Sequence, residues 1–366
     1  MQKQRIVIKI GSSSLTNDYG EIDVIKLQDH VNAIAALKEE KHEVILVSSG
    51  AVAAGFTSLG YPSRPVTLKG KQAAAAVGQS LLIQSYTELL HEFHITPAQI
   101  LLTKHDFSNR SRYRNAFQTI TELLDRGLIP IINENDTVSV DELTFGDNDM
   151  LSALVSGFIH ADMLIILTDI NGLYDQNPQI YPTAKRLDHI EVITEDLLKN
   201  AEGSGSKVGT GGMKSKLLAA KTASSLGVPV FIGIGQGRNK FSEIMKGNGD
   251  GTYIMKHRLG SINTKRQWIA LHSEAVGKLY IDEGAEDAIL NRGKSLLPAG
   301  VFKVKGTFEK GDVVEVHSVN GLLGKGVVTY SSNDLQEYVR KLHDKQVKNK
   351  FVPSIEIIHR DHWVEV

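Results

Sequence analysis

The chain has 366 residues and a formal net charge of −1 at pH 7. This length is sufficient for two domains, each with its own buried core. The balanced charge excludes a global electrostatic field that would attract nucleic acid or an anionic membrane, although a local basic patch is compatible with it. Cysteine is absent, which excludes disulfides, thiol nucleophiles and thiolate metal sites, and this fits a reducing compartment.

The amino terminus has no feature of a secretory leader. Residues 1–5 run directly into the β-branched stretch 6–10 (IVIKI), which lacks the long apolar core and the small-residue cleavage site of a signal peptide. No uncharged apolar run in the sequence is long enough to cross a bilayer. We therefore expect a cytoplasmic protein with no membrane partner.

Short apolar strands alternate with helical patterns in the first 255 residues. Strands are predicted at 6–10, 43–47, 100–102, 127–132, 162–167 and 228–234. Helices are predicted at 23–40, 72–90, 150–160 and 213–226, and an irregular segment at 235–250. This repeat predicts an open, mainly parallel α/β sheet covered by helices, which binds ligands at the carboxyl ends of its strands. No G-x-G-x-x-G follows the first strand, so a Rossmann nicotinamide or flavin site is unsupported.

Lys9 lies inside the first predicted strand, just before the small-residue turn 11–14 (GSSS). A lysine in a buried strand is costly unless its ammonium reaches water or an anion. We favour a functional role for Lys9 over the alternative of a surface lysine whose stem covers apolar neighbours.

Polar residues follow three other predicted strands. The turn 48–50 (SSG) suits an anion or a routine helix cap equally well. Asn133 and Asp136 come after the strand 127–132, and their amide and carboxylate groups suit an amino-acid head group. Thr168 and Asp169 follow the most apolar strand, which we expect to be buried on both faces.

Asn148 and Asp149 stand directly before the predicted helix 150–160. Either residue can cap that helix. Capping and ligand binding do not exclude each other, because a residue at a helix start is well placed to face a ligand.

The glycine-rich stretch 203–216 (GSGSKVGTGGMKSK) leads into a helix that carries Lys214, Lys216 and Lys221. Glycines let backbone amides converge on an anion, and the helix adds the positive end of its dipole, so we interpret the stretch as a phosphate site. It is not a Walker A loop, because Met213 occupies the position of the second glycine. Taken alone, the pattern fits a flexible surface loop equally well.

Short strands separated by glycine turns replace the α/β pattern from about residue 275. They are predicted at 277–281, 300–306, 312–316, 326–330 and 354–358, with a charged helix at 333–345. This spacing predicts a small β-barrel or sandwich. The resulting division is an α/β domain at 1–255, a basic linker at 256–274 and a β-rich domain at 275–366.

Six separated stretches occur along the chain in an order that is characteristic of one protein group. They lie at 9–14, 47–51, 130–136, 146–149, 167–169 and 209–213. Together they strongly resemble the amino acid kinase superfamily and, within it, the bacterial glutamate 5-kinases. The run 295–300 (SLLPAG), with Gly306 and Gly311, looks like the PUA domain attached to those kinases, so the resemblance covers nearly the whole chain.

The resemblance implies ATP-dependent phosphorylation of the γ-carboxylate of L-glutamate, the first step of L-proline biosynthesis. Lys9 and Lys216 would stabilise the transferring phosphoryl group, and Asp149 would hold those lysines in place. No general base is required, because the glutamate carboxylate is already ionised near neutral pH. The positions that match the glutamate site are Ser49, Asn133, Asp136 and Asn148.

ATP and Mg²⁺ are the expected cofactors, with the metal bridging ATP oxygens and no protein ligand assigned to it. The positions that match the ATP site are Lys9, Thr168, Asp169, Thr210, Gly211, Gly212, Met213, Lys214, Ser215 and Lys216. Feedback inhibition by proline is implied as well, since proline shares the α-carboxylate and amine of glutamate and would compete at Ser49, Asp136 and Asn148. Assembly into a homodimer or homotetramer is a further implication.

Two alternatives stay open. The first is another superfamily member that acts on acetylglutamate, aspartate, carbamate or UMP, which the segment 133–136 and the C-terminal domain disfavour. The second is an RNA-binding protein that acts through its PUA domain. The near-neutral charge and the lack of an aromatic RNA-stacking motif disfavour RNA, so we prefer a structural or regulatory role for that domain.

Overall fold

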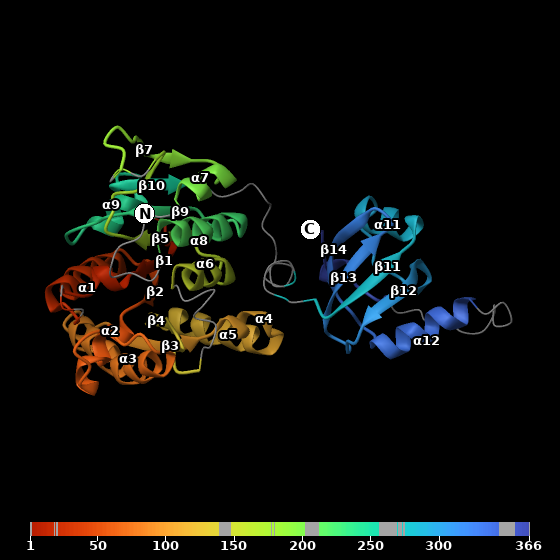
Figure 1. Cartoon of the computed structure of the whole chain (residues 1–366), viewed down its shortest axis with the longest axis horizontal. Coiled ribbons are helices and arrows are strands. Elements are labelled where there is room, and N and C mark those ends of the chain that lie inside the picture. The colour runs from red at the N-terminus through yellow and green to blue at the C-terminus, as the bar shows by residue number, and fades with distance from the viewer. Residues whose placement is uncertain are drawn as a thin grey trace. The chain divides into compact units, whose positions relative to one another are not determined.

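A computed structural model of the chain describes residues 2–17, 19, 21–138, 148–176, 178, 180–201, 212–255, 269, 273, 275–343 and 356–365. The chain forms two compact units, one made of residues 1–104 and 114–261 and the other of residues 105–113 and 262–366 (Figure 1). The limits 1–255, 256–274 and 275–366 for two domains and a linker stay a prediction.

The first unit is built on an eight-stranded sheet with the strand order β3-β4-β2-β1-β5-β9-β10-β8. Its strands are β1 (Arg5–Ile10), β2 (Glu43–Ser48), β3 (Pro97–Leu102), β4 (Ile129–Glu134), β5 (Met163–Leu167), β8 (His189–Ile190), β9 (Val230–Gly233) and β10 (Gly251–Ile254). The run from β3 to β9 is parallel, while β10 pairs antiparallel with β9 and parallel with β8. The predicted mainly parallel sheet is therefore confirmed. A separate antiparallel pair is formed by β6 (Leu173–Tyr174) and β7 (Arg186–Leu187).

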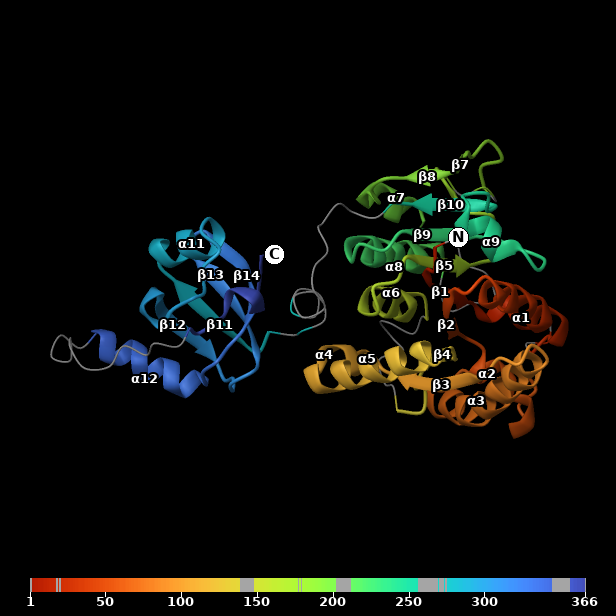
Figure 2. The same cartoon turned by 180° about the vertical axis from the view of Figure 1, so that it is seen from behind.

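Helices cover both faces of this sheet, as the two opposite views show (Figures 1 and 2). One face carries α1 (Val24–Glu39), α2 (Ala51–Gly55), α3 (Leu68–His91) and α9 (Lys240–Met245). The other carries α5 (Arg110–Asp125), α6 (Asn148–Phe158) and α8 (Met213–Ser225), with α7 (Glu195–Asn200) against α8. The remaining helical segments of this unit are η1 (Ser12–Ser14) and η2 (Thr57–Leu59), while α4 (Lys104–Ser108) lies mostly in residues of the other unit. Within the described part of the chain, no helix has the length and apolar character needed to span a membrane.

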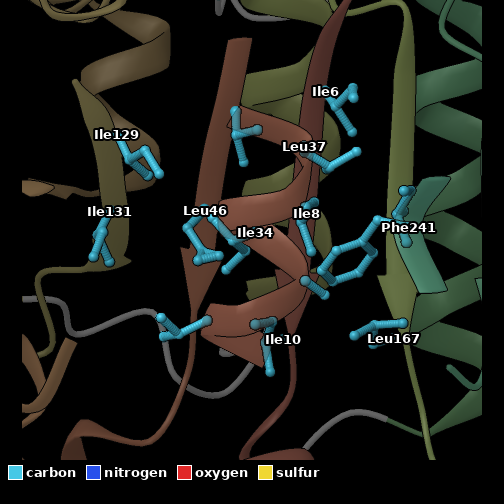
Figure 3. Packing of buried hydrophobic residues seen from close by; sticks show 14 of the residues in the cluster. Ile6, Ile8, Ile10, Ile34, Leu37, Leu46, Ile129, Ile131, Leu167 and Phe241 are labelled. Carbon is cyan, nitrogen blue, oxygen red and sulfur yellow. The ribbon is translucent and has the colours of Figure 1, made fainter. Parts of the chain in front are cut away.

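The core between the sheet and α1 explains how β1 is oriented. Ile6, Ile8 and Ile10 point toward α1, and Ile34 and Leu37 of that helix pack against them (Figure 3). These side chains are fully buried. Because successive side chains of a strand alternate between the two faces of the sheet, Lys9 lies on the opposite face, where α6 packs against β1.

Several helix predictions are confirmed with changed detail. Helix α1, predicted at 23–40, spans 24–39, because Asp23 caps it and its carboxylate accepts hydrogen bonds from the amides of Ile25 and Lys26. Val24, the first residue of the helix, is exposed. Helix α3, predicted at 72–90, spans 68–91 and buries one face.

Three predictions in this unit are wrong. Asn148 and Asp149 do not precede the helix predicted at 150–160, because α6 itself begins at Asn148 and ends at Phe158. Strand β4 does not end before Asn133 but continues through Glu134, because both residues pair with β3. The segment 235–250 is not irregular throughout, since it contains α9, whose apolar residues Phe241 and Ile244 are one turn apart and buried in the core. A helix of six residues is too short to show a clear period in the sequence.

The second unit contains a five-stranded sheet with the order β12-β11-β13-β14-β15. Its elements are β11 (Gly277–Ile281), α11 (Glu283–Leu290), η4 (Pro298–Gly300), β12 (Val301–Gly306), β13 (Val313–Ser318), β14 (Gly321–Val327), α12 (Ser332–His343), η5 (Arg360–His362) and β15 (Trp363–Glu365). The strands are antiparallel neighbours except for the parallel pair β11 and β13. The predicted strand-rich character is confirmed.

Some boundaries in the second unit differ from the prediction. The strand expected at 326–330 lies earlier, at 321–327, because it pairs with β13 through the glycine turn at 321. At 354–358 the described residues form only a bridge between Ile358 and Leu296. Helix α11 and strand β15 were not predicted, and both are short elements whose apolar residues complete the local core.

Candidate active site

The Asp149 carboxylate stands between two lysines from different parts of the chain. Its Oδ1 pairs with the Nζ of Lys9, and its Oδ2 lies 3.1 Å from the Nζ of Lys216. Asp149 is 0% exposed, Lys9 is 3% exposed and Lys216 is 8% exposed. The three residues that the family resemblance connects with phosphoryl transfer are thus one buried cluster, which we call the lysine-aspartate cluster.

The fold positions each member of this cluster by a local rule. Strand alternation turns Lys9 toward α6, the start of α6 presents Asp149, and the first turn of α8 presents Lys216. Helices α6 and α8 pack closely because Gly157 of α6 has no side chain. A Cβ at that position would lie 2.4 Å from Cδ1 of Leu226, which is too close for any larger residue.

The electrostatics of the lysine-aspartate cluster favour a ligand that is an anion. Its two ammonium groups and one carboxylate together carry a charge of +1. Buried charge is costly unless it is balanced. An anionic group that reaches both lysines would balance this charge, which is the requirement of a phosphoryl group in transit.

A second group of polar side chains surrounds Asn148, the residue before Asp149. Its Nδ2 donates to Oδ1 of Asn133 at 2.9 Å, to Oγ of Ser49 at 3.0 Å and to the carbonyl of Ser48 at 3.4 Å. Three of the four residues expected to bind the substrate are therefore in contact. The fourth, Asp136, is half-buried after the end of β4, and these hydrogen bonds do not include it.

The sequence-based assignment missed Gln79, which belongs to this polar group. It lies on the buried face of α3 and accepts a hydrogen bond through Oε1 from Nδ2 of Asn133 at 2.8 Å. A polar residue on a helix face of alanine, glycine and leucine was the available signal. The pairing with Asn133 could not be inferred, because the two residues are 54 positions apart.

One backbone amide determines the orientation of this whole polar network. The amide of Glu134 can only donate, and it lies 2.9 Å from Oδ1 of Asn133. Asn133 must then turn Nδ2 toward Gln79, which presents Oε1, while Asn148 presents Nδ2 to Asn133. As a result Nε2 of Gln79, a donor, and Oδ1 of Asn148, an acceptor, are buried without a hydrogen-bond partner among the described residues.

Residues expected to bind ATP lie in β1 (Lys9), directly after β5 and at the start of α8. Thr168 is held there because its amide donates to the carbonyl of Gly233 at 3.0 Å and its hydroxyl donates to Asp169 at 3.1 Å. Gly212 caps α8, and Met213, Lys214, Ser215 and Lys216 form its first turn. Thr210 and Gly211 lie outside the described residues.

Two comparisons with known proteins agree with this arrangement. The model of the amino acid kinase family matches residues 4–233, and the model of the PUA domain matches residues 277–352. Two curated relatives are named glutamate 5-kinase 1, one from Bacillus licheniformis with 65% identity and one from Bacillus subtilis with 62% identity, each covering 100% of both chains. A third, the glutamate 5-kinase of Oceanobacillus iheyensis, is 60% identical over 100% of this chain and 98% of its own length.

The amino acid kinase model covers most of the α/β unit that holds the lysine-aspartate cluster, and the PUA model covers most of the strand-rich region that follows it. The full-length relatives cover both regions. The chain is therefore a kinase that belongs to the amino acid kinase family and carries a C-terminal PUA domain.

Proposed function

We propose that the protein transfers the γ-phosphoryl group of ATP to the γ-carboxylate of L-glutamate and so forms γ-glutamyl phosphate, the first step of L-proline biosynthesis. The observation that carries the proposal is the lysine-aspartate cluster directly beside the polar group around Asn148. The names of the full-length relatives support the choice of glutamate as the acceptor.

In the proposed reaction a γ-carboxylate oxygen attacks the γ-phosphorus while the bond from that phosphorus to the ADP oxygen breaks. No proton has to be removed, because the carboxylate is ionised near neutral pH. The barrier comes from bringing two anions together and from charge on the phosphoryl oxygens. Lys9 and Lys216 offset that charge, and Asp149, which binds both lysines, positions them instead of acting as a base.

The polar group around Asn148 supplies what an α-amino acid requires. The buried donor of Gln79 and the hydroxyl of Ser49 suit a carboxylate, while the buried acceptor of Asn148 and the carboxylate of Asp136 suit an ammonium group. Asn133 holds Gln79 and Asn148 in these orientations. The position of this group next to Asp149 directs the γ-carboxylate of the substrate toward the two lysines.

In this proposal Thr168, Asp169 and the start of α8 would hold ATP, and Mg²⁺ bound with the nucleotide would offset charge on its phosphate groups. Among the described residues, no group of three or more His, Asp or Glu side chains is arranged to hold a metal ion. Asp149, the carboxylate at the centre of the site, already binds two lysines.

We further infer that proline inhibits the enzyme by competing for the polar group around Asn148, that the protein acts in the cytoplasm, and that it forms homodimers or homotetramers. Inhibition follows from the shared α-carboxylate and amine of proline and glutamate. The test is steady-state turnover at several proline concentrations, and rates that excess proline leaves unchanged would contradict it.

The reaction itself is tested by ADP release from MgATP with one acceptor at a time, in the presence of hydroxylamine, which traps an acyl phosphate as a hydroxamate. The acceptors are L-glutamate, L-aspartate, N-acetylglutamate, carbamate and UMP. We expect hydroxamate with L-glutamate alone. Turnover with another acceptor would contradict the assigned substrate, and no turnover with any acceptor would contradict the reaction and favour the RNA-binding alternative.

A further inference from the structure

A buried lysine outside the active site connects α9 to α1. The Nζ of Lys240 lies 2.5 Å from Oδ2 of Asp29 and 2.9 Å from Nδ1 of His30. The Lys240 side chain is 1% exposed. Because a buried ammonium needs partners of this kind, the contact is a specific feature of the fold and more than a surface ion pair.

The same histidine reaches the turn that follows β1. Its Nε2 lies 3.0 Å from the carbonyl of Ser14 in η1. A carbonyl only accepts, so Nε2 carries the proton and Nδ1 accepts from Lys240. Burial, and then the charge of Lys240, lower the pKa of His30 to about 4, and the ring is therefore neutral at neutral pH. His30 is thus held in one tautomer that joins Lys240 to η1.

The position of η1 matters for the lysine-aspartate cluster. A Cβ on Gly11, the residue between β1 and η1, would lie 3.4 Å from the Nζ of Lys9. The backbone at this point therefore runs beside the ammonium group. Lys26 of α1 also holds the turn, by donating to the carbonyls of Ser13 at 3.3 Å and Thr16 at 2.7 Å.

Asp29 extends the connection to the nucleotide side of the sheet. Its Oδ1 accepts from the amide of Gly237 at 3.0 Å, in the segment between β9 and α9. The carbonyl of Gly233 at the end of β9 accepts from the amide of Thr168. One network of side chains on α1 and α9 therefore has two attachments. His30 binds η1, which follows Gly11 beside Lys9, and Asp29 binds Gly237, which follows β9, the strand that supports Thr168.

We propose that His30, together with Lys240 and Asp29, is a positioning residue for phosphoryl transfer, which holds η1 and thereby the backbone at Gly11 beside Lys9 from the opposite face of the sheet. This rests on the proposed function. A displacement of η1 would move the turn beside Lys9 and lower the rate of transfer, since reacting groups tolerate errors of only a fraction of an ångström. ATP affinity changes little in a variant of His30, because the bond that reaches the nucleotide side, from the amide of Gly237 to Asp29, does not involve His30.

The test compares two polar substitutions of His30 with a control on the same pair of helices. In His30→Gln the amide nitrogen reaches about as far as Nε2 and keeps the bond to Ser14, whereas in His30→Asn it reaches only as far as Nδ1 and loses it. The control is Ser242→Ala, which removes the hydrogen bond from Ser242 of α9 to Glu40 at the far end of α1. The purified full-length variants are compared by thermal unfolding, steady-state kinetics and binding of a non-hydrolysable ATP analogue.

We expect His30→Asn to lower kcat by about 10-fold or more while analogue binding changes by less than about 3-fold. We expect His30→Gln and Ser242→Ala to keep kcat within about 3-fold of the wild type. A folded His30→Asn variant with wild-type kcat would overturn the proposal. Equal losses in His30→Asn and Ser242→Ala would overturn it too, because they would show a general effect of loosening α9.

Amide hydrogen exchange gives a readout that does not depend on the substrate. Peptides covering residues 11–16 should exchange at least about 10-fold faster in His30→Asn than in the wild type, and the Ser242→Ala control should not differ. If the wild type failed to phosphorylate glutamate, the proposed function would be wrong while this measurement still decided whether His30 holds the turn. Unchanged exchange in His30→Asn would overturn the positioning role.

Discussion

The side-chain Nδ2 of Asn148 donates a hydrogen bond to the side-chain Oδ1 of Asn133 at 2.9 Å and so joins the first residue of α6 to the end of β4. The next residue of the helix, Asp149, binds the two lysines. Two adjacent residues therefore face two different parts of the site, one made of neutral polar groups and one made of charges. This division is the basis of the predictions below.

Removing either lysine should lower turnover far more than nucleotide binding. Lys9→Ala and Lys216→Ala each delete a cation that offsets charge in the transition state, and we expect kcat to fall by about 10²-fold to 10³-fold. Lys221→Ala is the matched control, because Lys221 lies on the same helix as Lys216 but forms a surface ion pair with Glu195. Steady-state kinetics and equilibrium binding of an ATP analogue give the two quantities. If kcat and the affinity for the ATP analogue fell by the same factor, the lysines would act by binding the nucleotide in the ground state and would give no additional stabilisation to the transition state.

Neutralising Asp149 should affect stability as well as activity. Asp149→Asn leaves two buried ammonium groups without their shared counterion, and removing one partner of a buried ion pair typically costs about 3 kcal/mol of unfolding free energy or more. The control is Asp196→Asn, on the exposed surface of α7, which we expect to change stability by less than about 0.5 kcal/mol. Urea denaturation measures both. A variant as stable as the wild type would show that Asp149 does not balance the lysines in the folded protein.

Gln79 should govern the affinity for glutamate. In Gln79→Ala, Asn133 loses the acceptor of its amide and the site loses a buried donor, each worth about 1 kcal/mol, so KM for glutamate should rise by about 30-fold. KM for ATP should stay the same. Gln84→Ala on the exposed face of α3, where Gln84 bonds Glu88, is the control. A rise in both KM values to the same extent would indicate a general disturbance of α3.

The free energy of unfolding should decrease as the pH is lowered between the unfolded and folded pKa values of His30. Its pKa drops from 6.5 in the unfolded chain to about 4 in the folded protein, so the unfolded state binds more protons between these values. The free energy of unfolding is therefore undiminished above pH 6.5 and decreases as the pH falls toward 4, by at most about 1.4 kcal/mol per pH unit from this residue. Asp29, whose pKa is lowered by its hydrogen bond to Lys240 against the opposing effect of burial, acts only below pH 3.8.

Urea denaturation at pH 7, 6, 5 and 4 measures this slope. In His30→Gln the contribution of the imidazole is absent, so the variant should lose less stability than the wild type between pH 6.5 and 4. Identical slopes for the two proteins would show that His30 is not buried as a neutral ring.

The sequence by itself determined the parallel sheet and singled out Lys9, Asp149 and Lys216, which the fold brings together. The apolar runs of β1 and β5 specify central strands because they bury both faces, and Lys9 is conspicuous because it interrupts such a run. The position of Asp149 at a helix start is equally visible, since capping residues and apolar spacing are local patterns.

Only the tertiary structure decided which distant side chains meet. Gln79 and Asn133 are 54 positions apart, and His30 and Lys240 are 210 apart. No local pattern records such pairs, because the sheet order and the packing of α1 against α9 create them. The short helix α9 was missed for a related reason: six residues have little helical preference of their own, and burial of Phe241 and Ile244 against the core stabilises them. Local periodicity therefore predicts the elements, while burial of charged and polar groups against one another determines the site.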